Sequence, residues 1–118
     1  MNKTRILIID DEPRWIDFVK SDLSRFEIVV APDAEAALKE LEDDQFDLVI
    51  ASSGHLGVLR EIAEKYTDKR VVVTTVRPNT QEALNAYRLG ALRYFPKSFG
   101  PEDLLNRVRE LLPLSSKP

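Results

Sequence analysis

The stretch ILIIDDEP at residues 6–13 decides the fold of this 118-residue chain. Its four aliphatic residues are too few for a helix and are apolar on both faces, as in a parallel strand that is covered by helices on both sides. Pro13 suits the first turn of a following helix. Asp10, Asp11 and Glu12 then stand at the carboxyl end of a central strand, where open α/β sheets place their sites. One acid could simply cap the helix, but three in a row favour a metal or phosphoryl site, or the remnant of one.

Composition indicates one ordinary globular domain, with 43% hydrophobic and 31% charged residues. We expect this domain over residues 1–113, followed by a flexible tail or the start of a linker at 114–118. No apolar run is long enough to span a bilayer, and no signal peptide precedes the first strand. The absence of cysteine excludes disulfides and thiolate metal sites and fits a cytoplasmic protein. A net charge of −3 with scattered Lys and Arg gives no nucleic-acid footprint.

Strand and helix patterns alternate along the rest of the chain. Further strands are predicted at 27–31, 46–51, 70–75 and 91–95, each followed by a helical pattern.

The helical patterns have recognisable ends and inner faces. The first helix is predicted over 13–25, with Ile16, Val19, Leu23 and Phe26 inward and Trp15 off that stripe and only partly buried.

The later helices have local start and stop signals. Asp33 is expected to cap the second helix, and Asn79 or Thr80 to open the fourth. That fourth helix contains the apolar residues Ala83, Leu84 and Tyr87 and ends at Gly90, a good residue just past a helix end; Pro101 is expected to open the last helix.

Five βα units with short connections predict a parallel sheet with right-handed crossovers and helices on both faces. The fold class is therefore α/β, a flavodoxin-like (βα)5 three-layer sandwich with strand order 2-1-3-4-5.

These patterns resemble the receiver domain of bacterial two-component response regulators over nearly the whole chain. The match consists of residues 6–13, the run Asp47-Leu48-Val49-Ile50, Thr75, and the segment from Gly90-Ala91 through Tyr94 to Lys97 and Phe99. The resemblance implies a phosphorylation switch. In it Asp10 and Asp11 would hold Mg²⁺, Thr75 and Lys97 would contact phosphoryl oxygens, and Tyr94 would be the aromatic residue whose rotation reports the state.

The sequence departs from that family at the phosphoacceptor. The position that the family fills with aspartate falls on Ser52, flanked by Ala51 and Ser53. A serine hydroxyl is protonated at neutral pH and needs a base to become a nucleophile. We therefore expect a degenerate receiver, in which Ser52, Thr75 and Lys97 form a degenerate phosphorylation site.

Two neighbouring loops also depart from the family pattern. The loop after Ser52 is shorter than usual by about five residues, more than ordinary loop drift. Ser98 replaces the proline that normally follows the lysine through a cis bond. Because a cis bond before serine costs about 2.5–4 kcal/mol, the Lys97–Ser98 peptide is predicted to be trans.

No cofactor is expected other than weakly bound or absent Mg²⁺ at Asp10 and Asp11. We predict that Lys97 pairs with Asp10 or Asp11 in place of the cation. The alternatives are a solvated loop lysine and, for Thr75, a hydroxyl bonded to backbone. His55 is the only histidine, and no second histidine or cysteine supports a metal role for it.

Three function classes follow. The leading hypothesis is a non-enzymatic signalling module that works without aspartyl phosphorylation. The resemblance implies that it binds a protein partner, or itself, through the face of the fourth helix, fifth strand and fifth helix, around Tyr87, Arg88, Tyr94 and residues 101–109. The alternatives are a Mg²⁺-dependent switch with an unorthodox acceptor and a small-ligand binder. The last is weakest, because no Gly-rich phosphate loop follows any strand.

Overall fold

The computed structural model describes residues 3–66 and 70–112. One parallel sheet, ordered 2-1-3-4-5, is formed by β1 (Arg5–Ile9), β2 (Glu27–Ala31), β3 (Leu48–Ser52), β4 (Val71–Thr75) and β5 (Arg93–Pro96). The connections contain α1 (Pro13–Asp22), α2 (Ala34–Asp43), the 3₁₀ turn η1 (Ser53–His55), α3 (Gly57–Lys65) and α4 (Thr80–Arg88), and α5 (Asp103–Leu111) follows β5. The predicted flavodoxin-like fold is confirmed. In the part of the chain that the structure describes, no helix has the length and apolar character needed to cross a membrane.

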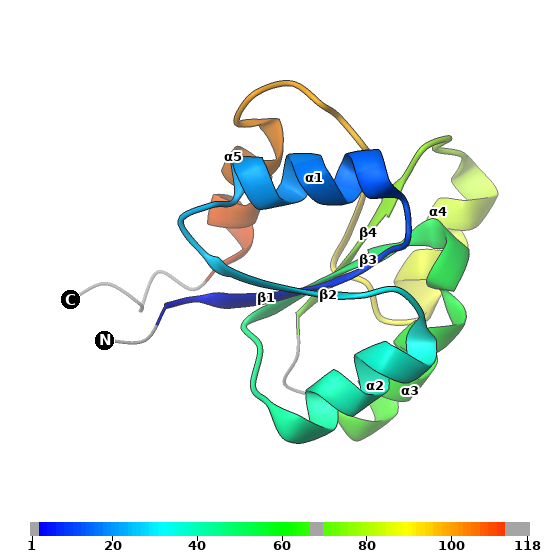
Figure 1. Ribbon diagram of the computed structural model, residues 1–118. Helices are drawn as coiled ribbons and strands as arrows, with labels where there is room; N and C mark the ends of the chain where they lie inside the picture. Colours follow the sequence, from blue (N-terminus) through cyan, green and yellow to red (C-terminus); the bar gives the residue numbers. More distant parts are fainter. Residues whose placement is uncertain (1–2, 67–69, 113–118) are drawn as a thin grey trace.

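Helices cover both faces of the sheet, with α1 and α5 on one side and α2, α3 and α4 on the other (Figure 1). Successive residues of β1 point to opposite faces. Ile6 and Ile8 pack with α1 and α5, whereas Leu7 and Ile9 pack with α2, α3 and α4. Because all four side chains are fully buried, the unbroken aliphatic run is explained by two cores that share one strand.

Helix ends follow the predicted local chemistry at three places. The Asp33 carboxylate accepts a hydrogen bond from the Ala36 N–H at 2.9 Å, and the Asn79 side chain accepts one from the Glu82 N–H at 2.8 Å. Both residues are therefore N-caps. Gly90 has φ 110°, a left-handed conformation that suits the residue after a helix.

The predicted inner face of α1 is wrong at its start, where Trp15 and not Ile16 points into the core. Trp15 is only 1% exposed, and together with Val19 and Leu23 it forms the inward stripe, whereas Ile16 is half-buried. The Trp15 ring stacks on Phe18 and meets Phe99 edge-on, with ring centroids 5.4 Å apart in each case. The loop between β5 and α5 supplies Phe99 and so closes the tryptophan off from solvent, which the spacing within α1 alone does not reveal.

Helix α5 begins at Asp103, two residues later than predicted. Pro101 lies in a turn, and Glu102 has φ 68°, in the left-handed region. The carboxylate of Asp22, at the end of α1, accepts hydrogen bonds from the N–H groups of Glu102 and Leu105, at 2.7 and 2.9 Å. The first turn of α5 is therefore capped from another helix, 80 residues earlier in the chain.

Candidate functional site

The predicted site residues meet at the carboxyl edge of the sheet. Asp10 follows β1, Ser52 and Thr75 end β3 and β4, and Lys97 follows β5. Strand register aligns these ends, since Ser52 pairs with Thr74 and Thr75 pairs with Pro96. The sheet topology thus brings together residues that are far apart in sequence, as open α/β sheets do at their sites.

Lys97 and Asp10 form a buried ion pair. The Lys97 Nζ lies 2.9 Å from Asp10 Oδ2, and the two side chains are 4% and 2% exposed. The geometry is that of a close charge contact without an aligned hydrogen bond. The other oxygen, Asp10 Oδ1, accepts a hydrogen bond from the Glu12 N–H at 3.1 Å, and Asp11 is exposed. Of the two partners predicted for Lys97 the structure selects Asp10, and the solvated-lysine alternative is wrong.

Further contacts fix the position of Lys97. Its Nζ lies 5.7 Å from the Trp15 ring centroid, within range of a cation–π contact, and 3.8 Å from Glu12 Oε1. Its backbone N–H donates to the Thr75 carbonyl at 2.8 Å. No peptide in the described ranges is cis, so the predicted trans Lys97–Ser98 bond is confirmed. Lys97 is therefore held by charge, by an aromatic face and by its own backbone.

The hydroxyl groups near the acceptor position bond to one another and to backbone. Ser53 Oγ donates to Thr75 Oγ1 at 3.1 Å, and the Arg77 N–H reaches the same oxygen at 3.2 Å. Ser52 Oγ accepts a hydrogen bond from the Gly54 N–H at 3.4 Å and so caps the 3₁₀ turn η1. The Thr75 hydroxyl therefore accepts a hydrogen bond from a backbone N–H group, as its predicted alternative role requires. Sequence reasoning missed the contribution of Ser53, because no spacing rule pairs it with Thr75.

Tyr94 ties β5 to the first turn of α4. Its hydroxyl donates to Glu82 Oε1 at 2.6 Å and accepts a hydrogen bond from the Asn79 N–H at 3.1 Å. Burial raises the pKa of Tyr94, and the hydrogen bond to Glu82 raises it further, whereas hydrogen bonds from Asn79 and Thr75 oppose the shift. Two other residues predicted for this surface, Tyr87 and Arg88, are exposed on α4 and do not join the site.

The donor set does not fit a tight magnesium site. Mg²⁺ prefers carboxylate and water oxygens in octahedral geometry. Here one oxygen of Asp10 is paired with Lys97, and Ser52, the predicted acceptor position, has a hydroxyl and no carboxylate. Within residues 3–66 and 70–112, no three His, Cys, Asp or Glu side chains are grouped as a metal would require. We therefore derive no chemical step through a metal ion.

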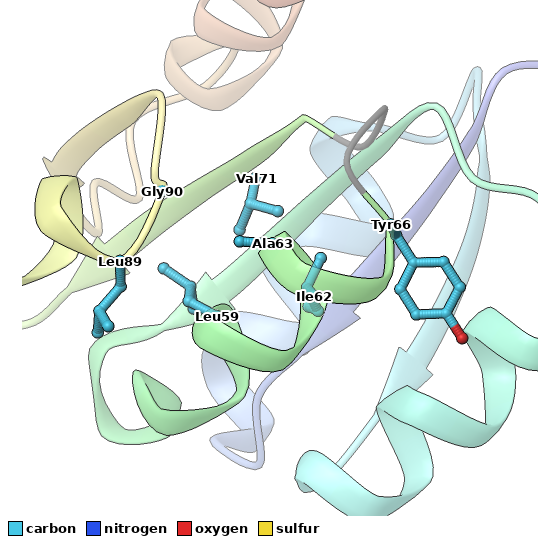
Figure 2. A pocket seen from close by; sticks show the side chains of 7 residues that line it. All are labelled: Leu59, Ile62, Ala63, Tyr66, Val71, Leu89 and Gly90. Atoms are coloured by element: carbon cyan, nitrogen blue, oxygen red, sulfur yellow. The ribbon is translucent and has the colours of Figure 1, made fainter.

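A separate hollow lies between α3, the start of β4 and the turn after α4 (Figure 2). Its volume is about 300 Å³, and its lining is uncharged: Leu59, Ile62, Ala63, Tyr66, Val71, Leu89 and Gly90. Figure 2 shows the Tyr66 ring directed away from Leu59 and Leu89. None of the predicted site residues lines this hollow. The hollow is therefore not part of the candidate site at the carboxyl edge.

Known proteins similar to this chain form one consistent group. The sequence profile described as "Response regulator receiver domain" matches residues 6–109. The transcriptional regulatory protein CpxR of Klebsiella pneumoniae is 30% identical over 95% of this chain and 50% of its own length. The heme response regulator HssR of Staphylococcus saprophyticus is 31% identical over 92% of this chain and 51% of its own length. The chain therefore spans about half the length of these curated relatives.

A solved structure agrees with these sequence matches. It is the response regulator protein TrrA of Thermotoga maritima, in complex with Mg²⁺ and BeF. TrrA is 32% identical, with a TM-score of 0.81 over 92% of this chain and 99% of that one. The extent of the profile match and the near-complete overlap with TrrA lead to the same assignment. This chain belongs to the response regulator receiver domain family of two-component signalling.

Proposed function

We propose that this receiver domain acts as a protein-interaction module that works without aspartyl phosphorylation. The observation that supports the proposal is the buried ion pair between Lys97 and Asp10, beside a strand that ends in serine. In this arrangement the lysine neutralises the carboxylate without a metal ion. Its ammonium group has a protein partner and needs no phosphoryl oxygen to satisfy its charge.

The chemistry at Ser52 supports the same proposal. A nucleophilic hydroxyl requires an adjacent general base, whereas Ser52 Oγ accepts a hydrogen bond from the backbone N–H group of Gly54. The neighbouring Ser53 and Thr75 hydroxyls bond to each other. These groups satisfy one another as parts of a loop, and the proposal assigns no enzymatic step to them.

One observation favours the alternative of a surviving Mg²⁺-dependent switch. Asp10, Asp11, Thr75 and Lys97 all stand at the positions that the family uses, and the TrrA relative is described in complex with Mg²⁺ and BeF. The switch would then need an acceptor other than aspartate, at Ser52 or elsewhere. A small-ligand binder remains the weakest candidate.

The proposed partner is a protein that docks on the face of α4, β5 and α5, around Tyr87, Arg88, Tyr94 and residues 101–109. We propose that this domain itself binds neither nucleic acid nor membrane. We also propose a cytoplasmic location, in keeping with the transcriptional regulators among its relatives.

Amide NMR spectra of the ¹⁵N-labelled chain test the proposal. Spectra are recorded without Mg²⁺, with Mg²⁺, and with Mg²⁺ plus beryllofluoride. We expect the peaks of Asp11, Ser52, Thr75 and Lys97 to stay in place. The matched positive control is Ser52→Asp, in which the restored carboxylate should produce Mg²⁺-dependent shifts. If the unmodified chain shows shifts that spread to Tyr94 and α5, the switch survives and the proposal is wrong.

A further inference from the structure

The hollow between α3, the start of β4 and the turn after α4 has a buried apolar floor and a rim that is open to solvent. The side chains of Leu59, Ile62 and Val71 form the floor and are at most 5% exposed. Ala63 and Gly90 are exposed at the rim, and Figure 2 shows them on α3 and on the turn after α4. The apolar surface is therefore recessed and does not project from the molecule.

Two small residues explain why the hollow is not filled. Gly90 has φ 110°, a left-handed conformation that side chains rarely adopt, so the backbone itself favours glycine there. A methyl group placed on Gly90 would lie 3.4 Å from the Ala63 Cβ, so the turn passes directly beside α3. Protein interiors are normally close-packed, but here a helix-ending glycine and one alanine leave space that larger side chains would occupy.

The lining determines the chemistry of a ligand. None of its seven residues has a charged side chain. A charged ligand would therefore lose water without gaining a counter-ion, which costs free energy. The volume of about 300 Å³ is at the lower end of the range for small-molecule pockets, roughly 300–1,000 Å³. It is also larger than an apolar cavity of about 150 Å³, which suffices for benzene.

We propose that this hollow binds a neutral, mainly apolar small molecule of one or two rings. The ligand packs on Leu59, Ile62 and Val71 and bridges α3 to the turn after α4. Such a ligand needs no phosphate loop, unlike the small ligands considered for the carboxyl edge. The hollow is separate from that edge, so the ligand site goes beyond the proposed function and does not depend on it.

A protein segment fits the hollow less well than a small molecule. Among the residues that the structure describes, the large hydrophobic side chains that are exposed lie elsewhere, and none of them lines the hollow. On α3 the other exposed positions between residues 60 and 65 are charged: Arg60, Glu61, Glu64 and Lys65. Interface centres are depleted of charged residues, and a stable interface buries about 800 Å² on each partner. The hollow lacks the surrounding apolar surface that such an interface needs.

Titration of the ¹⁵N-labelled full chain with indole tests the inference. Indole is neutral and has two fused rings, and indole-3-carboxylate presents the same rings with a charge. We expect indole to shift the amide peaks of Ala63, Tyr66, Val71 and Gly90, with a dissociation constant on the order of 1 mM for so small a ligand. Indole-3-carboxylate should bind at least about tenfold more weakly, because its carboxylate finds no counter-ion among the lining residues.

A variant that fills the hollow sharpens the test. In Ala63→Phe the ring grows from the rim into the space of the ligand, so the indole-induced shifts should disappear. Glu64→Phe places the same ring at the neighbouring exposed position of α3, outside the lining, and is the matched control that should keep them. Circular dichroism checks that both variants fold, and indole should raise the melting temperature of Glu64→Phe only. If Ala63→Phe does not fold, Ala63→Leu, with a smaller side chain, takes its place.

Any of several results would overturn the inference: no shifts with indole close to its solubility limit, shifts scattered over the whole surface, equal binding of indole-3-carboxylate, or shifts retained in the filled variant. A dimer in sedimentation whose interface covers the hollow would also overturn it, because a second copy would then be the occupant. These signals come from α3 and the turn after α4. Failure of the proposed function appears instead in the amides at the carboxyl ends of β3 and β4, so the two failures are distinguishable.

Discussion

Replacement of Lys97 by methionine should destabilise the fold strongly. The variant keeps an apolar stem beside Trp15 but removes the ammonium from Asp10, whose side chain is only 2% exposed. Removal of one partner of a buried ion pair leaves an uncompensated charge and costs about 3–5 kcal/mol. Glu12, at 3.8 Å and 41% exposed, adds little, because contacts between exposed charges contribute about 0–1 kcal/mol. We therefore expect the free energy of unfolding to fall by about 3 kcal/mol, the lower end of the range for buried pairs.

Urea unfolding at pH 7, followed by Trp15 fluorescence and by far-ultraviolet circular dichroism, measures this loss. The double variant Asp10→Asn/Lys97→Met should lose less than Lys97→Met alone, because the asparagine leaves no buried charge. The coupling between the two residues is the loss in the double variant minus the losses in Asp10→Asn and Lys97→Met measured separately. Lys65→Met, at an exposed position on α3, is the matched control and should change stability by no more than about 0.5 kcal/mol.

Magnesium should distinguish the variant from the unmodified protein. Without the ammonium, Asp10 and its acidic neighbours gain affinity for a cation. If the dissociation constant of the variant is about 1 mM, then 10 mM Mg²⁺ raises its free energy of unfolding by about 1.4 kcal/mol. The unmodified protein should gain much less. A loss below about 1 kcal/mol in Lys97→Met, or equal stabilisation of both proteins by Mg²⁺, would refute the reasoning that Lys97 replaces the cation.

Three further predictions concern other parts of the fold. Asp22→Ala should lower the free energy of unfolding by about 1–2 kcal/mol, since it removes the cap of α5, whereas Asp17→Ala on the exposed side of α1 should not. Glu102→Gly should raise the melting temperature, because φ 68° costs a non-glycine residue about 1–2 kcal/mol, part of which glycine regains. Burial and Glu82 raise the pKa of Tyr94 in the folded state, so its contribution to stability is complete below about pH 10 and is lost as the pH rises through the folded pKa. Urea unfolding of the unmodified protein between pH 8 and 11 should show this loss, and Tyr94→Phe should show a smaller one. Equal losses of stability in the two proteins over this pH range would contradict the prediction.

The fold was predictable because its determinants are local. The aliphatic run from Ile6 to Ile9 is buried on both faces, and such a run requires helices on both sides of its strand. Asp33 and Asn79 cap their helices through contacts only three residues away. For a chain of five βα units, the rules of strand connection allow few topologies.

The site was only partly predictable, because several of its contacts join distant segments. The pairing of Lys97 with a carboxylate followed from charge once the family resemblance placed Lys97, Asp10 and Asp11 at one site. The choice of Asp10 depends on which acid faces the sheet edge. The cap that Asp22 provides to α5 spans 80 residues or more, and no local pattern indicates it. Trp15 was misplaced for the same reason, since Phe99 shields it from another part of the chain.

The contacts at the carboxyl edge give the family motifs of this chain a structural role of their own. Asp10 cannot lose Lys97 without leaving a buried charge unpaired, and Thr75 anchors the segment before α4 through its bonds to Ser53 and Arg77. Each of these residues therefore has a structural contribution that does not depend on an acceptor at position 52. It follows that the presence of these residues is weak evidence for phosphoryl transfer in this chain.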